Sequence, residues 1–240
     1  MASRVNAKEA RQRLAAEAAA QAARERRRRT MIIFAAVAVL VLAVGGGIWW
    51  QIQRTAVDEV ADPGPQVASE LLGDGVAVGD ADGPVVDVYL DFLCSHCAEL
   101  EDRVGEAVAD LAVDGEARVV IHPITLIDPT ESARSAGAFG CAAGSDSVLG
   151  YQAALFENAG GGFSAERLVE IGASVGLTDA AFVQCVEDES EADWATAVNA
   201  AATERGVRGT PTIFVDGTEM DIQATETAAG FLAEIAAMAG

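Results

Sequence analysis

The sequence is short of basic residues. Its 240 residues include 16 lysines and arginines against 37 aspartates and glutamates, which gives a formal net charge of -21 at pH 7. This balance argues against a nucleic-acid-binding protein, because a phosphate backbone requires a basic surface. The six prolines and 24 glycines are too few for a collagen-like or low-complexity chain. The four cysteines are too few for a miniprotein built on disulfides.

The few basic residues are concentrated at the N-terminus. Residues 1–30 contain nine bases and three acids, whereas residues 31–50 contain no charge. Twenty apolar residues form a helix of about 30 Å, which is long enough to cross the hydrocarbon core of a bilayer. The four arginines at 26–29 precede this segment, so the positive-inside rule places the N-terminus in the cytoplasm and residues 51–240 outside. We therefore predict a cytoplasmic basic tail over 1–30 and an uncleaved transmembrane signal anchor over 31–50. A cleaved signal peptide is the alternative.

Turn-forming residues separate the apolar segment from the rest of the chain. Asp-Pro-Gly-Pro occupies residues 62–65 and further Gly-Asp turns follow. We predict a linker over 51–72 and a single domain over 73–240. A short edge strand is expected over 75–78. With 51% hydrophobic residues in the chain, there is ample material for a packed core.

The first part of the outer domain has the pattern of a βαβ unit. Residues 85–93, VVDVYLDFL, are typical of a buried strand. Apolar residues then recur at helical spacing from Leu100 to Leu111, with acids on the other face. Residues 117–124 have strand character again, and a right-handed crossover makes the two strands parallel. The motif Cys-Ser-His-Cys at 94–97 falls at the turn from strand to helix.

The remainder predicts an α-helical insertion followed by a return to the sheet. Residues 129–206 are almost wholly helical in pattern. Residues 209–217 have strand character and end in an Asp-Gly turn of type I′. The final segment is an amphipathic helix that should cover the sheet. The expected fold class is therefore α/β with a helical insertion.

The paired cysteines carry the functional argument. Cys94 and Cys97 are spaced so that they can cycle between a dithiol and a disulfide. Cys94 begins a helix, where the dipole and free N–H groups favour a thiolate, and His96 adds a donor or an imidazolium beside it. We predict that Cys94 is the exposed, attacking sulfur and that Cys97, one turn inward, resolves the intermediate. A structural disulfide, a zinc half-site that needs two more ligands, and a chance buried pair are the alternatives.

Two segments resemble the DsbA-like branch of the thioredoxin superfamily. They are Tyr-Leu-Asp-Phe-Leu-Cys-Ser-His-Cys at 89–97 and Gly-Thr-Pro-Thr-Ile-Phe-Val-Asp-Gly at 209–217. Residues 168–185 also resemble the helical insertion of that branch. The resemblance covers about residues 73–240. It implies a thioredoxin fold with an α-helical insertion and a protein thiol–disulfide oxidoreductase, in a membrane-anchored bacterial form of actinobacterial type.

The resemblance also implies roles for single residues. Pro211 would be a cis-proline facing the cysteines, which leaves the Thr210 backbone free to bind an extended substrate chain; an ordinary trans proline is the alternative. Cys94 would be the nucleophile and His96 its tuning neighbour. One departure is Ser95, which stands where strongly oxidising members often have proline.

A second departure concerns a buried acid. Many thioredoxin-like proteins carry one six residues before the first cysteine, where this chain has Val88. Asp87 and Asp91 lie nearby but fall on the opposite strand face by alternation. Whether Asp91 acts as a proton relay in place of the missing acid is open at this point.

The other two cysteines, Cys141 and Cys185, fall in the helical region. Outside the cytoplasm disulfides persist, and a bond between these two leaves the active pair free. We therefore predict a structural disulfide, with two free buried thiols as the alternative.

Taken with the resemblance, these features predict an oxidoreductase that introduces disulfides into exported proteins at the bacterial cell membrane. Its expected partners are reduced or unfolded exported proteins, the membrane, and a quinone-linked reoxidation partner of the DsbB or VKOR-like kind. No cofactor, metal or nucleic acid is expected. The alternatives are a reductase or isomerase, for example in cytochrome maturation, and a non-catalytic thioredoxin-like binding module or chaperone.

Overall fold

The computed structural model describes residues 66–79, 83–222 and 227–239, together with isolated positions 27, 31, 39, 41, 42 and 44. The chain divides into two units, Met1–Thr55 and Ala56–Gly240, and the elements named below belong to the second. No helix among the described residues is long and apolar enough to span a membrane. The predicted tail, the anchor and most of the linker lie outside the described residues, apart from those isolated positions.

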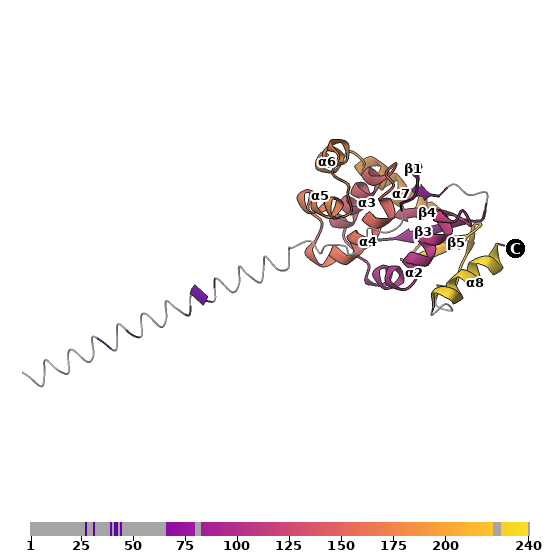
Figure 1. Ribbon diagram of the computed structural model, residues 1–240, viewed down its shortest axis with the longest axis horizontal. Helices are drawn as coiled ribbons and strands as arrows, with labels where there is room; N and C mark the ends of the chain where they lie inside the picture. Colours follow the sequence, from indigo (N-terminus) through magenta and orange to yellow (C-terminus); the bar gives the residue numbers. More distant parts are fainter. Residues whose placement is uncertain are drawn as a thin grey trace, which may run out of the picture. The chain divides into compact units, whose positions relative to one another are not determined.

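A mixed six-stranded sheet forms the centre of the domain (Figure 1). Its order is β1-β2-β4-β3-β5-β6, with β3 and β4 parallel and every other neighbouring pair antiparallel. The parallel pair confirms the βαβ unit expected from the sequence. The strands are β1 (Ser69–Leu71), β2 (Val76–Val78), β3 (Val85–Leu90), β4 (Arg118–Pro123), β5 (Thr212–Val215) and β6 (Thr218–Glu219).

The start of the sheet differs from the expectation. β2 is not an edge strand, because β1 pairs with it on one side and β4 on the other. β1 itself lies within the stretch that the sequence indicated as linker. It is held by contacts with the helical insertion: the Ser69 hydroxyl donates to the Ser145 carbonyl at 2.8 Å, and the Trp194 indole donates to the Leu72 carbonyl at 2.7 Å.

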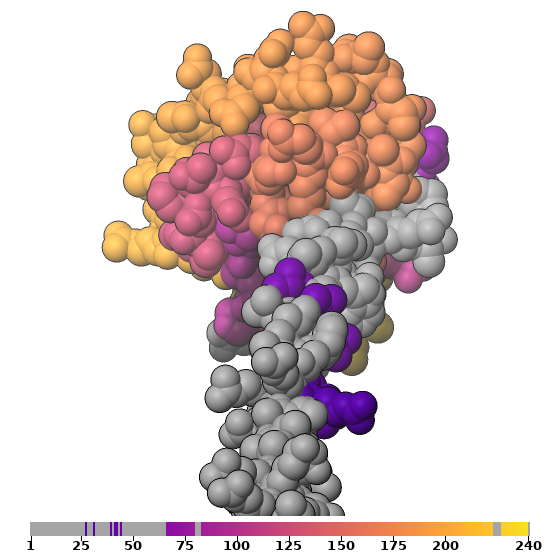
Figure 2. Space-filling view, turned by 90° about the vertical axis from the view of Figure 1, so that its left-hand side faces the viewer, coloured from indigo at the N-terminus to yellow at the C-terminus, as the bar shows by residue number. Residues whose placement is uncertain are grey.

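The described part of the domain contains seven α-helices. They are α2 (Ser95–Val113), α3 (Glu131–Ala142), α4 (Val148–Asn158), α5 (Ala165–Ser174), α6 (Ala180–Glu187), α7 (Ala192–Arg205) and α8 (Ala228–Met238), and a short 3-10 helix, Ala159–Gly161, follows α4. Of these helices, α2 and α7 contact β4. Helices α3 to α7 fall in the region predicted as a helical insertion. Figure 1 shows α5 and α6 at the far side of the domain from α8, and Figure 2 shows residues of the insertion forming one continuous surface.

Alternation along β3 separates two packed faces. Val86, Val88 and Leu90 join the main core, in which α2 and α8 pack on the sheet. Tyr89 belongs to a second cluster with Val198 and other residues near α7. The strand is therefore buried on both faces, which explains its almost continuous apolar sequence.

A buried ion-pair network lies on the α7 face. Asp87 of β3 is 3.0 Å from His122 Nε2 on β4 and 3.0 Å from Arg205 Nη2 on α7. Burial raises the pKa of Asp87, but the two cationic partners outweigh burial and hold the pKa below its ordinary value. His122 also stacks on Tyr89, with 4.3 Å between the ring centroids. This network ties α7 to both central strands.

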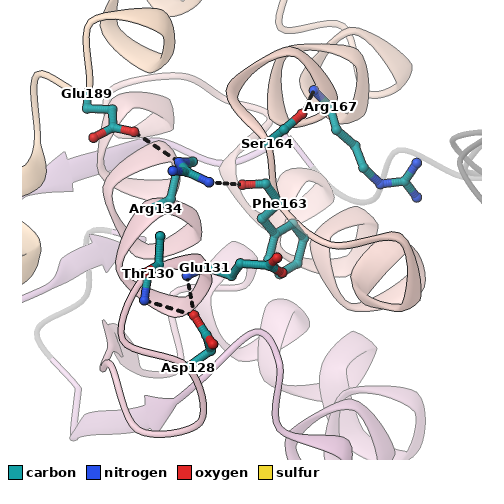
Figure 3. A network of polar contacts seen from close by, with 8 residues as sticks. All are labelled: Asp128, Thr130, Glu131, Arg134, Phe163, Ser164, Arg167 and Glu189. Atoms are coloured by element: carbon teal, nitrogen blue, oxygen red, sulfur yellow. Dashed lines mark hydrogen bonds and ion pairs between the residues drawn. The ribbon is translucent and has the colours of Figure 1, made fainter.

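Polar contacts organise the insertion around α3 (Figure 3). Arg134 donates to Glu189 at 2.9 Å and to the Phe163 carbonyl at 3.0 Å, so it connects three segments of the insertion. At the start of α3, Asp128 Oδ1 accepts the N–H groups of Thr130 and Glu131, each at 2.8 Å. These bonds satisfy N–H groups that the first turn of a helix leaves free.

Candidate active site

The Cys-Ser-His-Cys motif lies where β3 turns into α2. Cys94 immediately precedes the helix and has extended backbone angles, φ -81° and ψ 115°. Its carbonyl accepts the N–H groups of Cys97 at 3.0 Å and Ala98 at 3.1 Å. Cys94 therefore lies at the positive end of the helix dipole. Both cysteines are free, so the structure represents the dithiol form.

A cis peptide bond brings a distant loop to this cysteine. The Thr210–Pro211 bond is cis, directly before β5. The Cys94 thiol donates to the Thr210 carbonyl, with 3.4 Å between sulfur and oxygen. Residues separated by 116 positions in the chain thus meet at the site, and the backbone beside Pro211 lies next to the sulfur.

The same loop buries the Cys94 thiol. We expected Cys94 to be exposed, but only 6% of the residue is accessible, compared with 2% for Cys97. The expectation is wrong because the Thr210 carbonyl covers the thiol.

The second cysteine is chemically distinct from the first. Burial raises the pKa of the Cys97 thiol to about 12. Cys97 therefore keeps its proton at neutral pH. Because the thiolate is the reactive form, Cys97 can attack a disulfide only if another group removes that proton.

His96 lies on the outside of the motif. Its side chain is 76% exposed, and its Nδ1 atom is 3.3 Å from a carboxylate oxygen of Glu99, one turn further along α2. Among the described residues, the His96 imidazole thus contacts Glu99. The role of His96 as a tuning neighbour of Cys94 stays a prediction.

Asp91 holds the loops around the site. Its carboxylate is fully buried and accepts four hydrogen bonds. Oδ1 accepts from the Leu93 N–H and the Ser132 hydroxyl, each at 2.9 Å. Oδ2 accepts from the N–H groups of Leu126 and Ile127, each at 2.8 Å. Asp91 therefore joins the cysteine turn to the segment after β4 and to α3, and these four bonds assign it an architectural role.

A different acid lines a small cavity together with the buried cysteine. Val88 occupies the strand position where many relatives have an acid, and Asp87 faces α7. Glu101 of α2, however, lines the same small cavity as Cys97. Burial raises the pKa of Glu101 to about 7. The expectation that the acids of this helix lie on its other face is wrong for Glu101. Its position four residues after Cys97 was the available signal.

The remaining cysteines are bonded to each other. Cys141 of α3 and Cys185 of α6 form a disulfide, with Cα atoms 5.8 Å apart and 44 residues between them in sequence. The bond lies within the insertion and leaves the active pair as a dithiol. No group of three or more His, Cys, Asp or Glu side chains within the described ranges could hold a metal ion.

A dithiol at a helix start that faces a cis-proline beside a strand is typical of proteins that exchange thiols and disulfides. A family model described as thioredoxin matches residues 72–234. The chain belongs to this thioredoxin family. No curated protein matches the sequence.

Similar solved structures show to which group of thioredoxin-like proteins the chain is related. Reduced DsbA from Mycobacterium tuberculosis is 25% identical, with a TM-score of 0.59, over 70% of this chain and 93% of that chain. The disulfide bond oxidoreductase DsbG from the same organism is 25% identical, with a TM-score of 0.57, over 70% and 88%. MdbA, a thiol-disulfide oxidoreductase from Actinomyces oris, is 23% identical, with a TM-score of 0.57, over 65% and 80%. The chain is a DsbA-like thiol–disulfide oxidoreductase.

Proposed function

We propose that this enzyme introduces disulfide bonds into exported proteins at the outer side of a bacterial cell membrane. The observation that carries the proposal is the asymmetry of the dithiol. Cys94 lies at the positive end of α2 beside the cis-proline loop, whereas Cys97 is buried and protonated. A first sulfur at a helix start beside a cis-proline loop, paired with a second sulfur buried as a thiol, is an arrangement that can pass a disulfide to a substrate thiolate.

The proposed reaction consists of two exchanges. A substrate thiolate attacks Cys94 of the Cys94–Cys97 disulfide, which breaks that bond, releases the Cys97 sulfur and forms a mixed disulfide. A second substrate thiolate attacks the substrate sulfur of the mixed disulfide and releases Cys94. The substrate loses two electrons and the enzyme gains them. The backbone at Thr210 and Pro211 would bind the extended substrate chain beside Cys94.

The cellular setting is part of the proposal. Residues 31–50 would anchor the protein with its N-terminus in the cytoplasm, and a quinone-linked partner of the DsbB or VKOR-like kind would reoxidise the dithiol. The Cys141–Cys185 disulfide supports an extracytoplasmic domain, since such bonds persist in oxidising compartments. Fusing a reporter that is active only outside the cytoplasm to residue 240 should give an active reporter. The same fusion at residue 28 should be inactive, and the reverse pattern would contradict the orientation.

Refolding of reduced, unfolded ribonuclease tests the activity. The full chain, in its oxidised form, should restore ribonuclease activity, and Cys94→Ala should abolish this gain. The Cys141→Ala/Cys185→Ala double variant is the control, because it removes the two cysteines outside the site and keeps the dithiol. Undiminished oxidation by Cys94→Ala would contradict the proposal.

Ser95 favours a second candidate, a reductase or isomerase, because this position is often proline in strongly oxidising relatives. Equilibration of the dithiol with glutathione decides between the two. A reduction potential near that of DsbA, about -120 mV, supports an oxidase, and one near that of thioredoxin, about -270 mV, supports a reductase.

A further inference from the structure

A groove follows α2 away from the active-site turn. It lies between α2 and α4, has a volume of about 980 Å³ and extends along α2 from Ala98 to Asp110. The Ala98 N–H donates to the Cys94 carbonyl at 3.1 Å, so the groove begins one helical turn after the first cysteine. It follows about 18 Å of helix, which is the length of about five extended residues. The groove thus has room for a short stretch of polypeptide and starts next to the dithiol.

Apolar and acidic side chains line this groove together. Val108 of α2 is half-buried, and Leu149 and Phe156 of α4 are buried. The acidic lining residues are Glu101, Asp102, Glu106, Asp110 and Glu157. Among the described residues, no lysine or arginine lines the groove. The surface is therefore complementary to a segment that carries both apolar and positively charged side chains.

A buried amide in the groove has an acceptor atom to spare. Gln152 of α4 is only 6% exposed and lines the groove. Its Nε2 atom donates to Glu101 Oε2 at 2.8 Å, but its Oε1 atom has no hydrogen-bond partner among the described residues. A buried acceptor without a donor is unfavourable. A ligand that brings an N–H group to Gln152 Oε1 would remove this cost.

The Glu101 carboxyl lies beside this amide and over Gly105. A Cβ atom at Gly105 would lie 2.8 Å from the Glu101 carboxyl carbon, so the glycine leaves room for the acid. The ion pairs of the described residues do not include Glu101. Burial, with a further contribution from the Asp102 carboxylate, raises the pKa of Glu101 to about 7. A cation placed next to Glu101 would counteract both effects and stabilise the ionised carboxylate.

We propose that the groove between α2 and α4 binds a basic segment of the substrate polypeptide, and that an arginine of this segment pairs with Glu101 and Gln152. A guanidinium group carries five N–H donors in one plane, so it can donate to the Glu101 carboxylate and to Gln152 Oε1 together. A lysine ammonium is a point charge and matches two separate acceptors less well. This inference rests on the proposed function and specifies its substrates as chains with an arginine a few residues from the reacting cysteine.

A cysteine-free peptide measures binding apart from exchange. One fluorescent peptide of about eight residues carries a central arginine among leucines and serines, and a second carries citrulline, the uncharged isostere of arginine. Fluorescence anisotropy with the full chain in neutral detergent at pH 8, above the pKa of Glu101, gives both affinities. The arginine peptide should bind about 10-fold more tightly, since a hydrogen bond to a charged group contributes about this factor. In Glu101→Gln the two peptides should bind with similar affinity.

Further variants define the binding result. Glu204→Gln is the matched control, because it removes one charge from an exposed position on α7 outside the groove, and it should leave the 10-fold difference intact. Asp102→Asn should weaken arginine binding by only about twofold, since this carboxylate is exposed. Equal affinity of the two peptides for the unaltered protein, or an undiminished difference in Glu101→Gln, would overturn the inference. Tighter binding after glutamine replaces the four arginines at 26–29 would assign the groove to the chain's own tail and would also overturn it.

Oxidation of peptides with two cysteines connects the groove to exchange. The substrates carry arginine or citrulline about four residues after one cysteine. The arginine substrate should have a KM about 10-fold lower with the same kcat, because the contact is made equally in the bound substrate and in the transition state. Equal KM values for the two substrates would overturn the assignment of the groove to substrate. If neither substrate is oxidised, the proposed function is contradicted instead, and the cysteine-free peptides still decide whether the groove binds arginine.

Discussion

The substitution Asp91→Asn should destabilise the protein by about 3 kcal/mol, because the carboxylate is fully buried and accepts four hydrogen bonds. An asparagine side chain offers a single acceptor oxygen. Its best placement keeps that oxygen toward Leu126 and Ile127 and turns the amide nitrogen toward Ser132, whose hydroxyl can accept. The N–H of Leu93 then has no acceptor.

The magnitude follows from these contacts. A buried donor left without a partner costs about 1–3 kcal/mol. The two bonds that remain on the amide oxygen change from a charged to a neutral acceptor, and each loses on the order of 0.5–1 kcal/mol. The Leu93 N–H lies in the turn that leads to Cys94, so we expect the loss of stability to affect the active site directly.

Urea denaturation of the full chain, followed by far-ultraviolet circular dichroism, measures the change. Asp128→Asn is the matched control, because Asp128 lies in the loop before α3 and accepts two N–H groups, but its carboxylate is solvent-exposed. Its effect should be much smaller. If Asp91→Asn unfolds at the same urea concentration as the unaltered protein, the assignment of Asp91 as the connection between the loops is refuted.

Three further changes test packing elsewhere in the domain. Replacing both cysteines of the disulfide with alanine should lower the free energy of unfolding by about 4 kcal/mol, the loop-entropy value for a separation of 44 residues, as measured by urea titration. Contacts with His122 and Arg205 lower the pKa of Asp87 below its ordinary value of 3.8, so the unaltered protein should lose the stabilisation from the ionised carboxylate as the pH falls below 3.8. Asp87→Asn lacks this carboxylate, so its free energy of unfolding should fall less steeply in the same pH range. Acid titrations of both proteins measure this, and the same dependence of stability on pH in both would contradict the prediction. Gly172→Ala should cost about 1–3 kcal/mol, because its Cβ would collide with the Phe182 ring, whereas Gly160→Ala faces open space and should change the thermal midpoint little.

Local patterns were sufficient for the central unit of the fold. β3, α2 and β4 follow one another along the chain, and their periods of two and 3.6 residues are distinct. The turn between β5 and β6 was also evident from sequence: Asp216 and Gly217 both have positive φ, at 46° and 81°, as a type I′ turn requires. In each case the interactions that define the element are close in sequence.

The start of the sheet could be predicted only in part: the strand expected over 75–78 is β2, but it is not at the edge, and β1 was assigned to the linker. β1 and β2 have three residues each, too few for a periodic signal. Their positions depend on pairing with each other and with β4, more than 40 residues away. Pairing partners, not local preference, therefore decide where the sheet begins.

The CxxC pair and its place at the start of a helix were evident from the sequence, because they depend on spacing and patterns that are local in the chain. Its environment was decided by tertiary structure. The cover over Cys94 comes from Thr210, 116 residues away, and the contact that holds Glu101 comes from Gln152, 51 residues away. Burial raises the pKa values of Cys97 and Glu101, and this burial exists only once the distant segments have packed together.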